Sequence, residues 1–182
     1  APDAAFDTVD HITKKPAGGM RNALQESARI ARGEIRNIAS AGPDDLDAAV
    51  LPGGFGAAKT LCTFAAEGPK AKVHPAVASL LRGLWKAGKP IGALCIAPAV
   101  LAALFRDEKR KVKLTIGTDK GTADALRAAG MEHVDCRATE IAVDEANRIV
   151  TGPAYMLAGR ISEVAENARR VVAEVLRLAG RA

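Results

Sequence analysis

One cysteine stands where an apolar strand is expected to turn sharply into a helix. Cys95 follows the apolar run 91–94 and precedes the segment 96–99. A nucleophile at such a turn needs small neighbours because its backbone is crowded. The small residues around it are Gly92, Ala93 and Ala97. A helix starting near Ile96 would point free N–H groups and the positive end of its dipole at the sulfur, which favours a thiolate. Cys95 is therefore predicted to be nucleophilic; a buried packing cysteine is the plainer alternative.

A glycine-rich turn follows another apolar strand earlier in the chain. The segment 51–56 reads Leu-Pro-Gly-Gly-Phe-Gly, with Gly53 and Gly54 adjacent. Adjacent glycines allow unusual backbone angles and bring bare N–H groups close to a ligand. The turn lacks the spacing of a dinucleotide fingerprint and the Lys-Ser/Thr of a phosphate-binding loop, so nucleotide binding is not expected. A tight strand-to-helix connection without a ligand remains the alternative.

Helical and strand periods alternate along the chain. Helices are expected over 19–33, 58–66, 75–87, 96–105, 122–129 and 156–178. Strands are expected over 34–38, 48–51, 91–94, 114–117, 141–143 and 148–150, the last two forming a hairpin. This alternation predicts one α/β domain with a mainly parallel sheet, in which ligands bind at the carboxyl ends of the strands. Cys95 and the glycine turn both lie at that edge.

The composition excludes several classes of protein. The 182 residues are 48% hydrophobic and 26% charged, which fits a globular domain with a buried core. No apolar run reaches the roughly 20 residues that a membrane span needs. The formal charge of +5 is spread among acidic residues, so nucleic-acid binding is not expected. Three cysteines at wide spacing form neither a disulfide framework nor a metal site, and with no export signal they predict a cytoplasmic protein.

Four segments together resemble the ElbB glyoxalase-like family. This family is a branch of the PfpI/ThiJ superfamily, which is related to class I glutamine amidotransferases. The resemblance covers nearly the whole chain, and the motifs occur in the expected order. The matching segments are 52–59 (PGGFGAAK), 95–99 (CIAPA), 114–119 (LTIGTD) and 150–156 (VTGPAYM).

The resemblance implies a flavodoxin-like three-layer sandwich and a homodimer. It implies that Cys95 is the catalytic nucleophile and that the backbone of Gly53 or Gly54 and of Ile96 forms an oxyanion pocket. The implied activity is a lyase-type glyoxalase without a cofactor or metal, which converts small 2-oxoaldehydes such as glyoxal to hydroxy acids such as glycolate. The family is also loosely linked to isoprenoid biosynthesis.

The chain departs from the superfamily pattern in two places. Where the superfamily often has a histidine that partners the cysteine, this chain has Thr118 and Asp119, which are possible pocket residues together with Tyr155. The three histidines, His11, His74 and His133, are expected to have surface or loop roles. Secondly, residues 1–3 resemble the end of the second superfamily strand. Residues 1–182 are therefore expected to form a single domain without its first strand, first helix and most of the second strand.

Two further functions remain as alternatives. A redox-sensing or chaperone-like protein would need Cys95 only as an oxidisable thiol. A glutaminase component of an amidotransferase is disfavoured, because no C-terminal His-x-Glu pair follows His133.

Overall fold

The centre of the molecule is a four-stranded sheet. The computed structural model describes residues 1–181. The strand order is β3 (Ala49–Leu51), β4 (Ile91–Leu94), β8 (Ile149–Gly152) and β7 (Ala142–Asp144). The first three strands are parallel, and β7 runs antiparallel to β8, which confirms the predicted hairpin. All residues of β4 and β8 are buried, as expected for strands that are covered on both faces.

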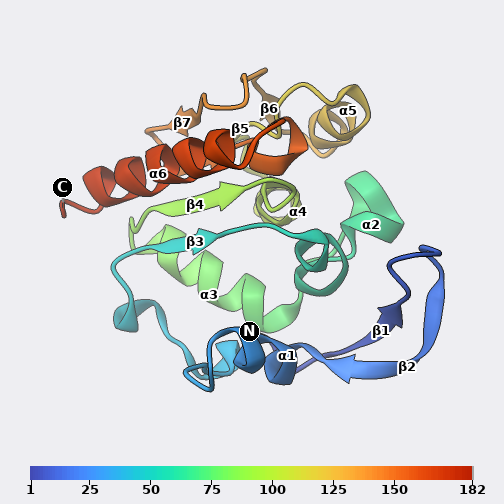
Figure 1. The fold of residues 1–182 in the computed structure, drawn as a ribbon. Coiled ribbons are helices and arrows are strands. Elements are labelled where there is room, and N and C mark those ends of the chain that lie inside the picture. Colours follow the sequence, from blue (N-terminus) through green and yellow to red (C-terminus); the bar gives the residue numbers. More distant parts are fainter. Residues whose placement is uncertain (182) are drawn as a thin grey trace.

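Helices cover the two faces of this sheet. Figure 1 shows α6 (Ile161–Leu178) on one side of β3 and β4 and α3 (Pro75–Lys86) on the other. Alternate residues of β4 divide between the two layers: Ile91 and Ala93 join the core formed with α3 and α4 (Pro98–Asp107), and Leu94 joins the core formed with α6. The expected three-layer α/β sandwich with a mainly parallel sheet is thereby confirmed.

A second, two-stranded sheet flanks the first. In it β5 (Lys113–Leu114) pairs in parallel with β6 (Glu132–His133), and α5 (Lys120–Ala128) connects them. The strand expected over 114–117 is only two residues long. Beyond it the Thr115 N–H donates to the Thr151 hydroxyl at 2.9 Å, so a side chain on β8 takes the place of a ladder partner.

The N-terminal region differs most from the sequence prediction. A hairpin of β1 (Ala5–Val9) and β2 (Pro16–Asn22) precedes a short helix, α1 (Ala23–Ile30), so the helix expected over 19–33 is wrong in its first turn. Gly19 lies at φ +99°, outside the helical region, and the Asn22 side chain caps α1 by accepting from the N–H groups of Leu24 and Gln25. Figure 1 shows this hairpin projecting beside α2 (Phe64–Glu67).

Other helix and strand boundaries also differ from the sequence prediction. No strand forms over 34–38, because residues 34–37 lie in no helix or strand and Ile38 begins the 3-10 turn η1 (Ile38–Ser40), which precedes η2 (Pro43–Asp45). The helix expected over 58–66 is interrupted at Cys62, which forms an isolated β-bridge with Val73. A π turn, η3 (Ala57–Leu61), and the short helix α2 replace it, and the 3-10 turn η4 (Gly68–Lys70) follows. The last helix begins only at Ile161, after the 3-10 turn η5 (Ala154–Met156). Residues 1–4 lie in no strand, and Pro2 has no N–H for a ladder.

One edge of the main sheet is open within the described residues. There β3 pairs only with β4, and Val50 is 38% exposed. On α6, Val172 and Leu176 are also exposed, although their neighbours Val171 and Val175 are buried against the sheet. None of the helices in residues 1–181 combines the length and the hydropathy needed to cross a bilayer.

Candidate active site

Cys95 occupies a strained turn between β4 and α4. Its φ is +58°, a left-handed conformation that costs a residue with a Cβ about 1–2 kcal/mol. The Cys95 N–H donates to the Gly152 carbonyl at 3.0 Å, and the Ala97 N–H donates to the Leu94 carbonyl at 3.0 Å. The side chain is half-buried, and its Sγ has no hydrogen-bond partner among residues 1–181. The predicted strand-to-helix turn is thus present, with α4 beginning at Pro98 instead of Ile96.

The glycine turn after β3 lies directly against this cysteine. A Cβ added to Gly53 would lie 2.7 Å from both Cys95 Cβ and the Leu94 carbonyl oxygen, so only glycine fits there. Gly53 and Gly54 both have positive φ, at +96° and +79°, but a Cβ on Gly54 would meet open space. The structure therefore brings together the two segments that the sequence placed at one edge of the sheet.

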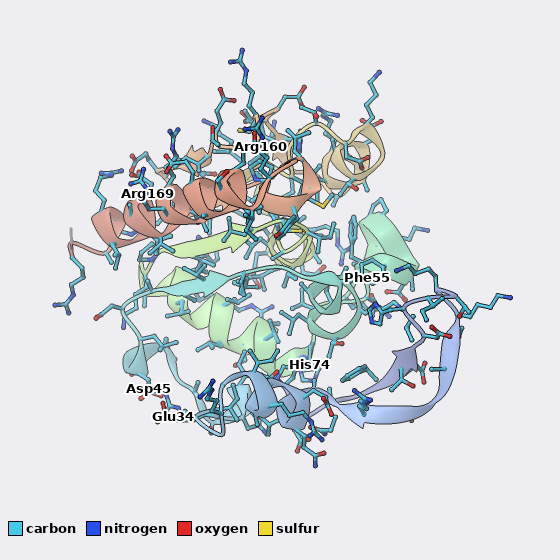
Figure 2. All side chains as sticks on the ribbon, in the orientation of Figure 1. Glu34, Asp45, Phe55, His74, Arg160 and Arg169 are labelled. Atoms are coloured by element: carbon cyan, nitrogen blue, oxygen red, sulfur yellow. The ribbon has the colours of Figure 1, made fainter. Side chains whose placement is uncertain are left out.

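Unpaired backbone N–H groups are available around this contact. Within residues 1–181 the N–H groups of Gly53, Gly54 and Ile96 donate no hydrogen bond. Free N–H groups beside a nucleophile are the donors from which oxyanion pockets are made. The next residue of the turn, Phe55, is 66% exposed, and Figure 2 shows it beside α2 on the outside of the molecule.

The turn after β8 forms a third side of the site. Ala154 lies at φ +43° and is buried, whereas Tyr155 in the same turn is 61% exposed. A Cβ on Gly117 would lie 3.1 Å from Pro153 Cβ, so the loop after β5 lies against this turn. Tyr155 and the Thr118 loop therefore occupy the same edge of the molecule as Cys95.

Asp119 has a structural role at the start of α5. Its side chain accepts a hydrogen bond from the Thr122 N–H at 2.8 Å and caps the helix. The hydrogen bonds from the Thr122 side chain and N–H lower the pKa of this carboxyl group. Thr118 is exposed, and neither it nor Asp119 has a hydrogen bond to Cys95.

Of the histidines, His133 is held most firmly, and its side chain is fully buried. Its Nε2 accepts from the Ile116 N–H at 3.3 Å, and its Nδ1 faces Asp135 Oδ1 at 3.3 Å, an arrangement that requires the tautomer with the proton on Nδ1. Burial, together with the charge of Arg127, lowers the pKa of His133. Its role is therefore structural, although the sequence suggested a more exposed position. Figure 2 shows His74, the residue before α3, in the lower part of the molecule.

The other two cysteines are buried. The Cys62 Sγ–H donates to the Ala57 carbonyl at 3.4 Å, and Cys136 lies beside the Thr115 hydroxyl. Burial raises the pKa of both thiols, which makes them poor nucleophiles. Cys136 lies outside the helices and strands and is only 5% exposed.

Cys95 lies away from two hollows in the molecule. Two cavities, of about 540 and 450 Å³, lie elsewhere: the first within the β1–β2 hairpin and the second beside α5. Cys95 lines neither. In residues 1–181 there is no group of three His, Cys, Asp or Glu side chains arranged to hold a metal ion.

Sequence reasoning missed two residues beside the site, Gly152 and Asn167. Asn167 is fully buried on α6, and its amide contacts the turn after β8. The available signal was a polar residue within an otherwise apolar stripe on the last helix, formed by Val164, Val171, Val175 and Leu178.

Known proteins resemble this chain over its whole length. The mitochondrial glutamine amidotransferase-like class 1 domain-containing protein 3 from Homo sapiens is 40% identical over 192 residues, which cover 100% of this chain and 70% of the human protein. The mitochondrial ES1 protein homolog from Rattus norvegicus is 39% identical, with 100% of this chain and 71% of the rat protein covered. No family model matches the chain.

A solved structure supports the same assignment. The crystal structure of an isoprenoid biosynthesis protein with an amidotransferase-like domain from Ehrlichia chaffeensis has a TM-score of 0.87 and 35% sequence identity. The match covers 97% of this chain and 80% of that protein.

The expected cytoplasmic location is contradicted by these relatives. The human and rat proteins and the ES1 protein from Danio rerio are all named as mitochondrial. Unpaired cysteines argue for a reducing environment, but they do not distinguish one reducing compartment from another. On sequence and fold together, the chain belongs to the ES1 and glutamine amidotransferase-like class 1 domain-containing protein 3 family, whose members are class I glutamine amidotransferase-like proteins.

Proposed function

We propose that the protein uses Cys95 as a nucleophile on small 2-oxoaldehydes and converts glyoxal to glycolate without a cofactor. The observation that carries the proposal is the strained left-handed turn at Cys95, packed against Gly53 and flanked by unpaired N–H groups. Backbone strain of this kind persists only where the surrounding structure enforces it, and it concentrates at functional sites.

The chemistry follows from this arrangement. The Cys95 thiolate would bond to one aldehyde carbon, and the carbonyl electron pair would move to the oxygen, which the N–H groups of Gly53, Gly54 and Ile96 would stabilise. Protonation of that oxygen gives a hemithioacetal. Transfer of the proton on this carbon to the neighbouring carbon gives a thioester with a hydroxymethyl group. Water then cleaves the carbon–sulfur bond, releases glycolate and restores the thiol.

The pocket walls in this proposal come from the glycine turn after β3, the turn after β8 and the loop after β5. Tyr155 lies on the turn after β8, and Thr118 and Asp119 lie on the loop after β5. Since the Asp119 carboxylate already accepts from Thr122, Asp119 is placed in the wall and not assigned as the base. Water at this open edge is the proposed proton carrier.

Product formation by two cysteine variants tests the proposal. Wild-type protein and Cys95→Ser would be incubated with glyoxal and with methylglyoxal, and the hydroxy-acid products measured. We expect at least a hundredfold loss in Cys95→Ser, because a hydroxyl is a far weaker nucleophile than a thiolate. Cys62→Ala is the matched control, since it removes a buried thiol outside the turn and should retain turnover. Equal product yields from wild type and Cys95→Ser would refute the proposed glyoxalase activity.

A redox-sensing role is the second candidate. It is favoured by the half-buried Cys95 Sγ, which has no hydrogen-bond partner among residues 1–181, because oxidation needs an accessible thiolate but no partner base. Peroxide oxidation confined to Cys95, seen by mass spectrometry in a protein that turns over neither aldehyde, would support this role over the glyoxalase.

Two further proposals concern the extent of the domain and its oligomeric state. We propose that a first strand, a first helix and most of a second strand complete the domain beside β3, supported by the open β3 edge and the exposed Val50, Val172 and Leu176. A form that carries such a segment should aggregate less than the 182-residue chain. The homodimer is likewise proposed, and sedimentation equilibrium would test it.

A further inference from the structure

Asn167 is a polar residue in the apolar face of α6. It is completely buried, between the hydrophobic residues that hold this helix to the sheet. A buried amide persists only where its donor and acceptor are both satisfied. Its surroundings therefore indicate why an asparagine, and not a leucine or a valine, stands here.

The Asn167 amide connects two segments that are otherwise separate. Its Oδ1 accepts from the Ala154 N–H at 3.0 Å, and its Nδ2 donates to the Glu140 carbonyl at 2.8 Å. The first bond holds the turn after β8, and the second holds the segment before β7. One side chain from α6 thus fixes both ends of the β7–β8 hairpin at the edge of the sheet where Cys95 lies.

Gly152 lies between this amide and Cys95. A Cβ on Gly152 would overlap Asn167 Oδ1 and lie 2.9 Å from Val171 Cγ2, so the asparagine packs directly on the glycine backbone. The carbonyl of the same glycine accepts from the Cys95 N–H at 3.0 Å. A continuous series of contacts therefore runs from Asn167 through Gly152 to the backbone of Cys95.

Ala154 adds a second reason for the bond. It is buried and held at φ +43°, a conformation that alanine adopts only under constraint. The bond from its N–H to Asn167 Oδ1 contributes to that constraint, together with the hydrogen bonds that the Ala154 carbonyl accepts from the N–H groups of Leu157 and Ala158. Because Gly152 lies two residues before Ala154, the conformation of this turn bears directly on the glycine whose carbonyl accepts from Cys95.

We propose that Asn167 is a positioning residue for Cys95, acting through Gly152 and Ala154. The inference rests on the proposed function only in taking Cys95 as the reactive group. Removing the amide should loosen the turn after β8, release the Cys95 N–H and lower the reactivity of the thiol.

The test is the rate of Cys95 alkylation by iodoacetamide in the folded protein, followed by mass spectrometry. We expect Asn167→Ala to slow this rate at least fivefold. Asn167→Asp keeps an oxygen for the Ala154 N–H and should restore more than half of the wild-type rate. Asn167→Leu fills the same volume without either hydrogen bond, so it repeats the test if Asn167→Ala fails to fold.

Asn147 provides the matched control, because it is the buried asparagine at the other end of β8. Its Oδ1 accepts from Arg110 Nε at 2.9 Å, and its Nδ2 donates to Asp144 at 2.8 Å. Asn147→Ala also loses two side-chain hydrogen bonds and should leave the Cys95 rate within twofold of wild type. Alkylation of the buried Cys62 and Cys136 reports general opening of each variant.

The results distinguish the positioning role of Asn167 from the proposed glyoxalase function. A Cys95 rate within twofold of wild type in Asn167→Ala, or an equal loss in Asn147→Ala, would overturn the positioning role. Alkylation requires no turnover, so failure of the wild-type protein to convert glyoxal would refute the proposed function and leave this test intact.

Discussion

Two strand-to-helix turns at the same edge of the molecule are built differently. The turn after β4 holds Cys95 in a left-handed conformation against Gly53. The loop after β5 ends in Asp119, which caps α5 in an ordinary extended conformation. Both turns contain residues that the sequence marked as candidates, but only the first holds a residue other than glycine in a left-handed conformation. This difference indicates that the reactive residue lies where the fold maintains an unfavourable backbone conformation.

The largest expected effect comes from the contact between Gly53 and Cys95. Gly53→Ala should lower the free energy of unfolding by about 3 kcal/mol, because it adds positive-φ strain and a clash with backbone and Cβ atoms. Gly54→Ala adds strain but meets open space, so it should cost about 1 kcal/mol. Urea unfolding measures both. Equal losses would show that the close approach to Cys95 is not rigid.

The strain at Cys95 can be measured by a pair of substitutions at that position. Cys95→Gly should be about 1 kcal/mol more stable than Cys95→Ala, because glycine tolerates φ +58° without the Cβ penalty. At the neighbouring Ala97, where φ is −62°, a glycine should instead reduce stability. Thermal and urea unfolding of the three variants provide the comparison. A Cys95→Gly variant less stable than Cys95→Ala would mean that the turn is unstrained.

Substitutions at Asp119 test the comparison at the loop after β5. Asp119→Asn preserves a side-chain oxygen for the Thr122 N–H and should leave glyoxal turnover within threefold of wild type. Asp119→Ala removes the cap and should lower the melting temperature. Because hydrogen bonds lower the pKa of Asp119, its stabilisation is present above the unfolded pKa of 3.8 and is lost as the pH falls below that value. A large loss of turnover in Asp119→Asn would give this loop a chemical role.

The smallest effect concerns His133, which holds the backbone before the same loop. Burial lowers its pKa below 6.5, so the unfolded state binds a proton before the folded state does. Its stabilisation is therefore present above pH 6.5 and decreases as the pH falls through 6.5 toward the folded value. Urea unfolding at pH 7.5 and 5.5 should show this decrease in wild type. It should persist in the exposed control His11→Gln and be smaller in His133→Gln; an unchanged slope in His133→Gln would contradict the assignment.

Local patterns predicted the parts of the fold in which local and tertiary preferences agree. The strand over 91–94 matches the structure, and α3 and the β7–β8 hairpin match to within about one or two residues, because their apolar periodicity also suits the core. The pattern over 19–33 failed because Gly18 and Gly19 allow a hairpin that short-range periodicity does not reveal. The interruption at Cys62 depends on a bridge to Val73, a contact between segments separated by a loop.

For the candidate site, the sequence by itself determined the reactive residue type and its setting: a cysteine after a buried strand, small neighbours, and a glycine pair after a second parallel strand. Tertiary structure decided the rest. It set φ +58° at Cys95, brought Gly53 into contact with it, and turned Asp119 toward α5. It also placed Asn167 from the last helix on Gly152. These features arise from contacts between residues distant in the chain, whose geometry follows from packing and not from local preference.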